Sequence, residues 1–301
     1  MGLHIRQATA EDIPGMVALF NANTTPPKSD YFFQWWNSIP SVTFCAIHGE
    51  QLVGMFVVLK RKLINGLRCG VLMGLLVNSE WRGKGLFKEL GVTAMDYCKE
   101  MDLFCCLTNA IGEKALEKNF KFRTVGSIET MTLPSKVSPD CLDCTRIPIT
   151  RDTRFNVFGM EGRSPLMFLA DEDFRRWRFS VHPRHAYDIV RMGLDEYAVV
   201  NRYQEVNSNI RYGDIVDFEI KELGEERLMN LLDCAAAGLG RDVDMITVQA
   251  IPDSLVYRVC RKMGFGESSA RHYFCITVRE PSNKYLYDST RWLIKWGDYL
   301  R

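Results

Sequence analysis

The residues best suited to chemistry form a short glycine-bearing stretch, Arg82-Gly83-Lys84-Gly85. Two glycines let a backbone curl closely around a ligand, and two cations supply positive charge. An apolar run, residues 69–77, precedes the stretch, and an apolar stripe at helical spacing, residues 86–98, follows it. A helix that begins here would direct its unpaired amides and the positive end of its dipole at the same spot. The pattern predicts a site for a pyrophosphate.

Other phosphate-binding patterns fit this stretch poorly. It lacks the Lys-Ser or Lys-Thr ending of a nucleoside-triphosphate loop and the six-residue glycine fingerprint of a dinucleotide site. Two glycines two residues apart are common by chance, so the prediction depends on the strand before the loop and the helix after it.

The first half of the chain alternates strand-like and helix-like segments around this loop. A helix between the buried runs 69–77 and 103–108 implies a crossover and parallel pairing of those strands. We therefore expect an α/β (α+β) fold with a mixed, mostly antiparallel sheet flanked by helices. The expected strands are residues 5–8, 42–47, 52–63, 69–77, 103–108 and 124–133, and the expected helices are 10–20, 31–36 and 113–118.

The second half repeats a similar order without a glycine loop. Residues 134–148 contain three prolines and little pattern, which indicates a linker. We expect two domains, residues 1–138 and 149–301. The expected strands of the second are 197–203, 212–220, 245–250 and 272–278, and its helices are 225–237 and 254–263.

The composition is that of a soluble globular protein. Lys and Arg total 38 against 37 Asp and Glu, so no overall field would attract nucleic acid or an acidic membrane. The start of the chain lacks a signal pattern, and no run approaches the roughly 18 apolar residues of a membrane span. We interpret the protein as cytoplasmic, with no nucleic-acid or membrane partner.

The ten cysteines fall mostly in apolar stretches and are expected to be reduced core residues. Cys141 and Cys144 have metal-ligand spacing, but no second Cys or His pair stands at a matching interval. A simple loop is favoured over a zinc site there, and no metal is predicted.

The loop and its flanks resemble the GNAT superfamily of acyl-CoA N-acyltransferases. That family's pyrophosphate loop is Arg or Gln, two residues, Gly, one residue, then Gly or Ala, and residues 82–87 match it except at Phe87. The departure is tolerable if the amide of Phe87, not its side chain, meets the phosphate. The resemblance covers residues 3–133 well and the second half loosely, which implies a tandem arrangement with a degenerate second GNAT-like domain.

The resemblance also implies acyl-CoA as the co-substrate, without a metal. The strand 103–108 would splay from its neighbour to admit the pantetheine arm, which would pair with backbone of the preceding strand. The implied cofactor-binding residues are Leu75, Leu76, Val77, Arg82, Gly83, Lys84, Gly85, Leu86, Phe87 and Asn109.

The family's usual acid, a Tyr four residues before a Gly-Phe pair, has no counterpart in residues 115–122, where Asn119-Phe120 or Lys121-Phe122 takes the place of the pair. Asn109 and His272 are the catalytic candidates, beside deprotonation through water. The alternative for Asn109 is a turn cap, and for His272 a packed surface histidine.

The acceptor candidates are aromatic and basic. Tyr31, Trp35 and Trp36 could stack on a flat acceptor, although core packing is as good an explanation for one tryptophan, since neighbouring positions cannot both be buried on one face. Arg178, Arg184 and Arg271 could bind the phosphates of a nucleotide sugar, with solvated surface arginines as the alternative.

The Leu-Phe loop ending, the Trp-rich second helix, the degenerate second half and the ending Trp296-Gly297-Asp298 look similar to bacterial GNAT proteins of surface-polysaccharide (O-antigen, lipopolysaccharide) genes. Some of these acylate nucleotide-linked amino sugars such as dTDP-3-amino-3,6-dideoxyhexoses. The resemblance implies N-acylation of such an amine from acetyl-CoA or a short hydroxyacyl-CoA. A peptide or polyamine acceptor, or a CoA-binding module without turnover, remains the alternative.

Overall fold

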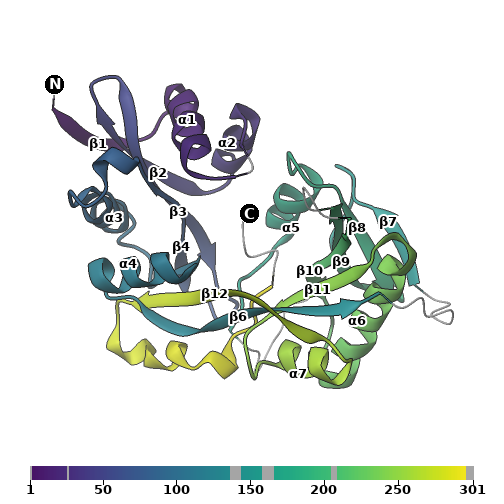
Figure 1. The fold of residues 1–301 in the computed structure, drawn as a ribbon. Coiled ribbons are helices and arrows are strands. Elements are labelled where there is room, and N and C mark those ends of the chain that lie inside the picture. Colours follow the sequence, from purple (N-terminus) through teal and green to yellow (C-terminus); the bar gives the residue numbers. More distant parts are fainter. Residues whose placement is uncertain (1, 26, 136–143, 158–165, 205–208, 296–301) are drawn as a thin grey trace. The chain divides into compact units, whose positions relative to one another are not determined.

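The computed structural model describes residues 2–25, 27–135, 144–157, 166–204 and 209–295. The chain divides into two compact units, which we describe separately. The first comprises Met1–Val125 and Tyr273–Tyr287, and the second comprises Gly126–His272 and Asp288–Arg301 (Figure 1). Cys141 and the ending Trp296-Gly297-Asp298 lie outside the described residues.

The first unit is built on a mixed sheet with the strand order β1-β2-β3-β4-β5-β12. Neighbouring strands are antiparallel except β4 and β5, which are parallel because α3 connects them as a crossover. The sheet class predicted from the sequence is thus confirmed. Its strands are β1 (Leu3–Gln7), β2 (Ser41–His48), β3 (Gln51–Lys62), β4 (Arg68–Val77), β5 (Leu103–Thr108) and part of β12 (Gly266–Val278).

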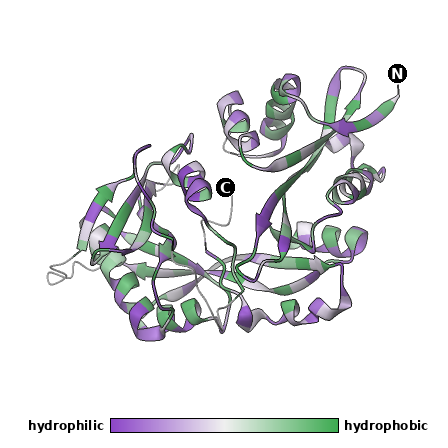
Figure 2. Cartoon of the chain, turned by 180° about the vertical axis from the view of Figure 1, so that it is seen from behind, coloured by the Kyte–Doolittle hydropathy of each residue, from purple (hydrophilic) through white to green (hydrophobic). Residues whose placement is uncertain are grey.

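Helices cover both faces of this sheet (Figure 1). They are α1 (Ile13–Asn23), α2 (Asp30–Asn37), α3 (Leu86–Tyr97) and α4 (Ala110–Phe120). Alternate residues of β3 point to opposite faces, so Phe56 packs with Leu86 and Leu90 of α3, whereas Met55 points the other way, toward α2. Figure 2 shows the resulting hydrophobic and hydrophilic bands along the helices. None of the described helices is long and apolar enough to span a membrane.

The strands of the second unit follow the order β6-β11-β10-β9-β8-β7. Only β10 and β11 are parallel, and α6 connects them. The order β10-α6-β11-α7 therefore repeats β4-α3-β5-α4 of the first unit, as expected for a second GNAT-like domain. Its elements are β6 (Arg123–Pro134), β7 (Cys144–Pro148), α5 (Glu172–Arg175), β8 (Tyr187–Met192), β9 (Glu196–Gln204), β10 (Arg211–Glu219), α6 (Glu225–Leu239), β11 (Met245–Ala250) and α7 (Leu255–Lys262).

Two strands, β6 and β12, pair with strands that are distant from them in the sequence. The strand expected at 124–133 leaves the first unit as β6 and pairs with β11, from Glu129↔Ala250 to Pro134↔Met245. The end of β12 instead pairs with β5, from Tyr273↔Thr108 to Val278↔Leu103. The two units consequently differ from the consecutive segments 1–138 and 149–301, and part of the expected linker forms β7.

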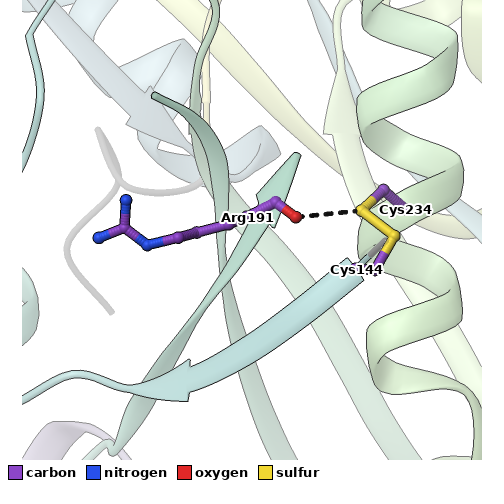
Figure 3. The surroundings of a disulfide bond; sticks show 3 residues. All are labelled: Cys144, Arg191 and Cys234. Atoms are coloured by element: carbon purple, nitrogen blue, oxygen red, sulfur yellow. Dashed lines mark hydrogen bonds between the residues drawn. A yellow bond between two sulfur atoms is a disulfide. The ribbon is translucent and has the colours of Figure 1, made fainter. Parts of the chain in front are cut away.

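A disulfide corrects the expectation that all cysteines are reduced. Cys144 of β7 and Cys234 of α6 are bonded, with 5.7 Å between their Cα atoms, and the Cys234 sulfur lies 3.4 Å from the Arg191 carbonyl oxygen (Figure 3). The seven other described cysteines are free and buried as expected, and burial raises the pKa of the Cys45 thiol to about 12. The described residues contain no cluster of three metal-binding side chains.

Candidate functional site

The parallel strands β4 and β5 separate partway along their length. They pair from Cys69↔Leu103 to Leu72↔Cys106, and then each strand continues without the other. β4 runs on to Val77, while the end of β5 pairs with β12 on its other side. The splay predicted for residues 103–108 is therefore present, and no described strand pairs with this edge of β4 from Met73 onward. We call this opening the fork.

A bulge lies in β4 beside the fork. The register with β3 shifts between Leu76↔Met55 and Met73↔Val57, which gives β4 one residue more than β3. Gly74 lies in this bulge with φ 56°, a conformation that favours glycine. A glycine inside an apolar run is the sequence signal for such a bulge.

Val77 presents its backbone to the fork. The Asn78 N–H donates to the Val53 carbonyl oxygen at 2.9 Å, so Val77 and Gly54 form a non-hydrogen-bonded antiparallel pair. In such a pair the amide and carbonyl point away from the partner strand. The Val77 carbonyl oxygen accepts from Arg82 Nε at 3.1 Å, which leaves the Val77 N–H directed toward the fork.

The loop after β4 ends at the start of α3, as predicted. Gly83 and Gly85 have φ 75° and 83°, and a Cβ at either position would meet nothing within 4 Å, so the backbone conformation and not space calls for glycine. Gly85 is the N-cap of α3 and has no side chain to accept from the first turn. The first helical bond at this end runs from the Glu89 N–H to the Gly85 carbonyl oxygen. The amides of Leu86, Phe87 and Lys88 therefore form the open end of the helix.

The two cations of the loop have different surroundings. The guanidinium of Arg82 donates to the Val77 carbonyl oxygen and, at 2.5 Å, to Asn23 Oδ1 at the end of α1. It fastens the loop to β4 and α1, a role for Asn23 that no sequence signal indicated. Lys84 Nζ lies 5.1 Å from the centre of the exposed-edge Trp81 ring. Lys84 thus remains the cation beside the open helix end.

Phe87 departs from the resemblance without blocking the loop. Its ring lies 5.4 Å from the Phe120 ring of α4 and 6.0 Å from the Phe56 ring of β3, between the centroids. The side chain therefore packs between α3 and α4 while its amide stays in the first turn. Gly91 allows this close packing, because a Cβ there would lie 2.2 Å from the Phe120 ring.

Asn109 follows the free end of β5 and caps α4. Its Oδ1 accepts from the N–H groups of Ile111 at 3.1 Å and Gly112 at 2.9 Å. The turn-cap interpretation is thus confirmed, and the remaining polar atom, Nδ2, can only donate. At the other end of α4, Lys121 has φ 58° and Phe122 is buried, so Lys121-Phe122 takes the place of the Gly-Phe pair.

The expected acceptor aromatics are largely core residues. Trp35 and Trp36 are each 5% exposed, so the expectation that the two could not both be buried is wrong. Helix α2 is covered on more than one side, since Trp36 stacks on Phe33 with 5.6 Å between ring centroids and also contacts Phe20 of α1. Tyr31, at 54% exposure, is the one of the three that is accessible.

The remaining candidates belong to the second unit. Arg178 is 4% exposed and donates to the Tyr187 hydroxyl at 2.6 Å, so it is an interior residue rather than a surface arginine. Arg184 is exposed. His272 is partly buried on β12, and the side chain of Arg271 lies outside the described residues.

A separate cavity of about 370 Å³ lies in the first unit. It is lined by residues of β1, α1, α2 and β2 and by the segment between β1 and α1. Its polar lining is uncharged and includes Gln7, Gln34 and Asn37. None of the predicted site residues lines it.

Comparison with known proteins identifies the loop-bearing unit. Residues 13–121 match the Acetyltransferase (GNAT) family, a segment that contains α1 to α4, the fork and the glycine loop. This segment of the chain therefore carries a GNAT acetyltransferase domain, and enzymes of that family use acyl-CoA as co-substrate. No curated protein matches the sequence.

Solved structures share the fold across both units. A putative acetyltransferase from Pyrococcus horikoshii is 14% identical with a TM-score of 0.64, and the match covers 99% of this chain and 96% of that one. A tandem GNAT protein from the clavulanic acid biosynthesis pathway is 15% identical with a TM-score of 0.58, covering 94% and 100%. A GCN5-related N-acetyltransferase from Anabaena variabilis is 8% identical with a TM-score of 0.66, covering 92% and 73%. At these identities the likeness shows the tandem GNAT fold.

Proposed function

We propose that this protein binds acyl-CoA along the free edge of β4 and transfers the acyl group to the amine of a small acceptor. One observation carries the proposal: only the loop 78–85 separates the open end of α3 from the strand whose edge is not paired with β5 beyond Leu72. A site for a diphosphate and a site for an extended amide-containing arm are therefore adjacent in one segment of chain.

The pyrophosphate of the coenzyme would be held by the amides of Leu86, Phe87 and Lys88. Each charge interaction at a helix N-terminus contributes about 0.3–1 kcal/mol, and Lys84 adds a cation. The pantetheine arm contains amides that pair with a free strand edge, as in strand addition, and the Val77 N–H is directed toward it. The loop thus compensates for a chain with a formal net charge of +1.

The reaction needs a neutral amine and a protonated leaving group. A C–N bond forms as the C–S bond breaks, the amine loses a proton, and the thiolate gains one. Asn109 cannot take the proton, since only its Nδ2 donor remains, so it is a candidate to bind a carbonyl oxygen. We therefore propose that the amine proton leaves through water and that positioning supplies much of the rate.

For the acceptor we propose a nucleotide-linked amino sugar, such as a dTDP-3-amino-3,6-dideoxyhexose of surface-polysaccharide synthesis. This rests on the resemblance described above. Among the acceptor candidates of the first unit, Tyr31 has an exposed side chain that is available to stack on such a ligand. Polyamine or peptide amines form the second acceptor class, and a CoA-binding module without turnover is the alternative to an enzyme.

The test measures thiol release from acetyl-CoA and 3-hydroxybutanoyl-CoA with a panel of nucleotide amino sugars, free amino sugars, polyamines and peptides. Release that requires an amine supports the transferase, and the most efficient amine identifies the acceptor class. Calorimetric binding of CoA without release for any amine would instead support the binding module. A Gly85→Glu variant is assayed in parallel. Any thiol release that it still shows does not depend on the glycine loop.

A further inference from the structure

We propose that Trp36, Met55 and Val57 form a wall beside Gly74 that restricts the acyl group of the coenzyme to about two or three carbons. We call these three side chains the acyl wall. The inference rests on the proposed function, because it assigns acyl-chain selectivity to the same site. It makes a buried residue of α2 and two of β3 the determinants of that selectivity.

The position of the thioester follows from the two ends of the fork. The proposed pyrophosphate site lies at the start of α3. The free edge of β4 runs from Val77, the end nearer to α3 in the sequence, back to Met73. The fork closes where Leu72 pairs with Cys106, and there the Cys106 sulfur lies 3.5 Å from the Leu72 carbonyl oxygen. An arm that follows β4 inward from Val77 must end before this point. The reacting end of the coenzyme therefore lies beside the bulge at Gly74.

The acyl group would then face α2 and not α3. A Cβ on Gly54 would meet Leu86 and Leu90 of α3, which defines the face where the coenzyme enters. A Cβ on Gly74 would instead meet Trp36 of α2, on the opposite face. Because β4 and β5 are no longer paired beside Gly74, a thioester bound there would present its acyl group to the α2 side.

That side is already filled. From the Cβ position of Gly74, Met55 Cε and Trp36 Cη2 are each 3.0 Å away, and Val57 Cγ2 is 3.2 Å away. The three residues are 1%, 5% and 1% exposed, in the order given, and Trp36 is held by its stack on Phe33. Protein interiors are packed like organic crystals, so each added methylene would have to displace one of these side chains.

The energetic scale of such a wall is known in general terms. One methylene in a hydrophobic pocket changes specificity about 10- to 200-fold. We therefore expect hexanoyl-CoA to bind at least about 10-fold more weakly than acetyl-CoA. Met55 is the most adaptable member, since its unbranched side chain can change rotamer.

The experiment measures dissociation constants of CoA, acetyl-CoA, butanoyl-CoA and hexanoyl-CoA by calorimetry, which needs no acceptor. It compares the wild type with Trp36→Ala and Met55→Ala, each checked for folding by circular dichroism. Both variants should bring hexanoyl-CoA to within about 3-fold of acetyl-CoA by removing a pocket contact. Should Trp36→Ala fail to fold, Met55→Ala decides the question alone.

Leu59→Ala is the matched control. Leu59 is fully buried on the same face of β3, but it pairs with Val71, below the base of the fork. It should leave the order of the four affinities unchanged. Equal affinity of the wild type for acetyl-CoA and hexanoyl-CoA would overturn the acyl wall, as would persistent discrimination in a folded Met55→Ala variant. Failure to bind CoA at all would instead count against the proposed function.

Discussion

Arg82 Nε donates a hydrogen bond to the Val77 carbonyl oxygen at 3.1 Å and so closes the glycine loop onto the strand that it follows. The same guanidinium reaches Asn23 at the end of α1. One side chain thereby fixes the position of the loop relative to two elements. Its role is to position the amides of α3, in addition to any attraction that its charge exerts on a phosphate.

Replacement of Arg82 should weaken coenzyme binding by loosening the loop. We expect Arg82→Ala to raise the dissociation constant of CoA about 10-fold, the equivalent of 1.4 kcal/mol. Arg82→Lys should restore little of the CoA affinity, since an ammonium group lacks the planar guanidinium geometry that reaches two acceptors at once. Isothermal titration calorimetry checks both. Full rescue by lysine would show that charge alone matters.

Asn23→Ala probes the same contact from the other side. It removes the second acceptor of Arg82 while keeping both loop charges. We expect a 2- to 5-fold loss of CoA affinity, in line with about 0.5–1 kcal/mol for a partly exposed hydrogen bond. Asn21→Ala, two residues earlier on the same helix, is the control and should bind CoA like the wild type.

Strand β12 comes from the C-terminal part of the sequence, and we expect it to stabilise the first unit. Phe274 of β12 is fully buried and pairs with Leu107 of β5. Phe274→Ala should destabilise the protein by about 3–5 kcal/mol through the cavity it leaves. Urea denaturation measures this loss. At urea concentrations too low to unfold the variant, its CoA affinity should be close to that of the wild type. A urea midpoint equal to that of the wild type would contradict the placement of β12.

The disulfide between Cys144 and Cys234 should stabilise the second unit. The two residues are 90 positions apart, and a crosslink that closes a long loop typically contributes about 2–4 kcal/mol. Cys144→Ser and Cys234→Ser should each lower the thermal midpoint, and the double variant should lower it no further. Mass spectrometry without reductant should show two hydrogens fewer than the all-thiol protein. A thiol count of ten would exclude the bond.

Acid should destabilise the second unit through Asp217, which is 4% exposed and bonded to Lys295 and Arg175. Burial acts to raise the pKa of this carboxyl, but the two cations outweigh it and hold the pKa below its ordinary value of 3.8. A depressed pKa contributes stability that is present above pH 4 and is lost as the pH falls further. Circular dichroism against pH should therefore show unfolding below about pH 4.

Asp217→Asn tests the same pair at neutral pH. Removal of one partner from a buried ion pair costs about 3–5 kcal/mol, because the other charge stays buried. Asp244→Asn is the control, since its pair with Arg211 is exposed and solvent-screened and should contribute little to stability. Equal midpoints for the two variants would contradict the buried network.

The sequence was most informative where pattern and chemistry coincide. The loop at 82–87, the helix after it and the parallel strands 69–77 and 103–108 follow from glycine chemistry and local periodicity, and the structure confirms them. Strand pairing was harder to predict. Strands that are neighbours in the sequence usually pair, yet β6 pairs with β11 and β12 pairs with β5. The alternation of apolar residues predicts a strand but not its partner.

The burial and the partners of individual side chains were the hardest features to predict from the sequence. Trp35 and Trp36 are both buried because α2 is covered on two sides, which the spacing within one helix cannot reveal. The buried Arg178 donates to Tyr187, a residue of β8, and the apolar pattern of the sequence did not predict that strand. The disulfide joins residues 90 positions apart, and no spacing rule pairs them.

The most direct test of the account compares Gly85→Glu with Gly66→Glu by calorimetric CoA binding. Both glycines have positive φ, 83° and 88°, and at both an added Cβ would meet open space, so strain and introduced charge are matched. Gly66 lies in the turn between β3 and β4, and its variant should bind CoA like the wild type. Gly85→Glu should abolish measurable binding, because a carboxylate would then stand at the open end of α3. Unchanged affinity in a folded Gly85→Glu protein would contradict the claim that these amides hold the coenzyme.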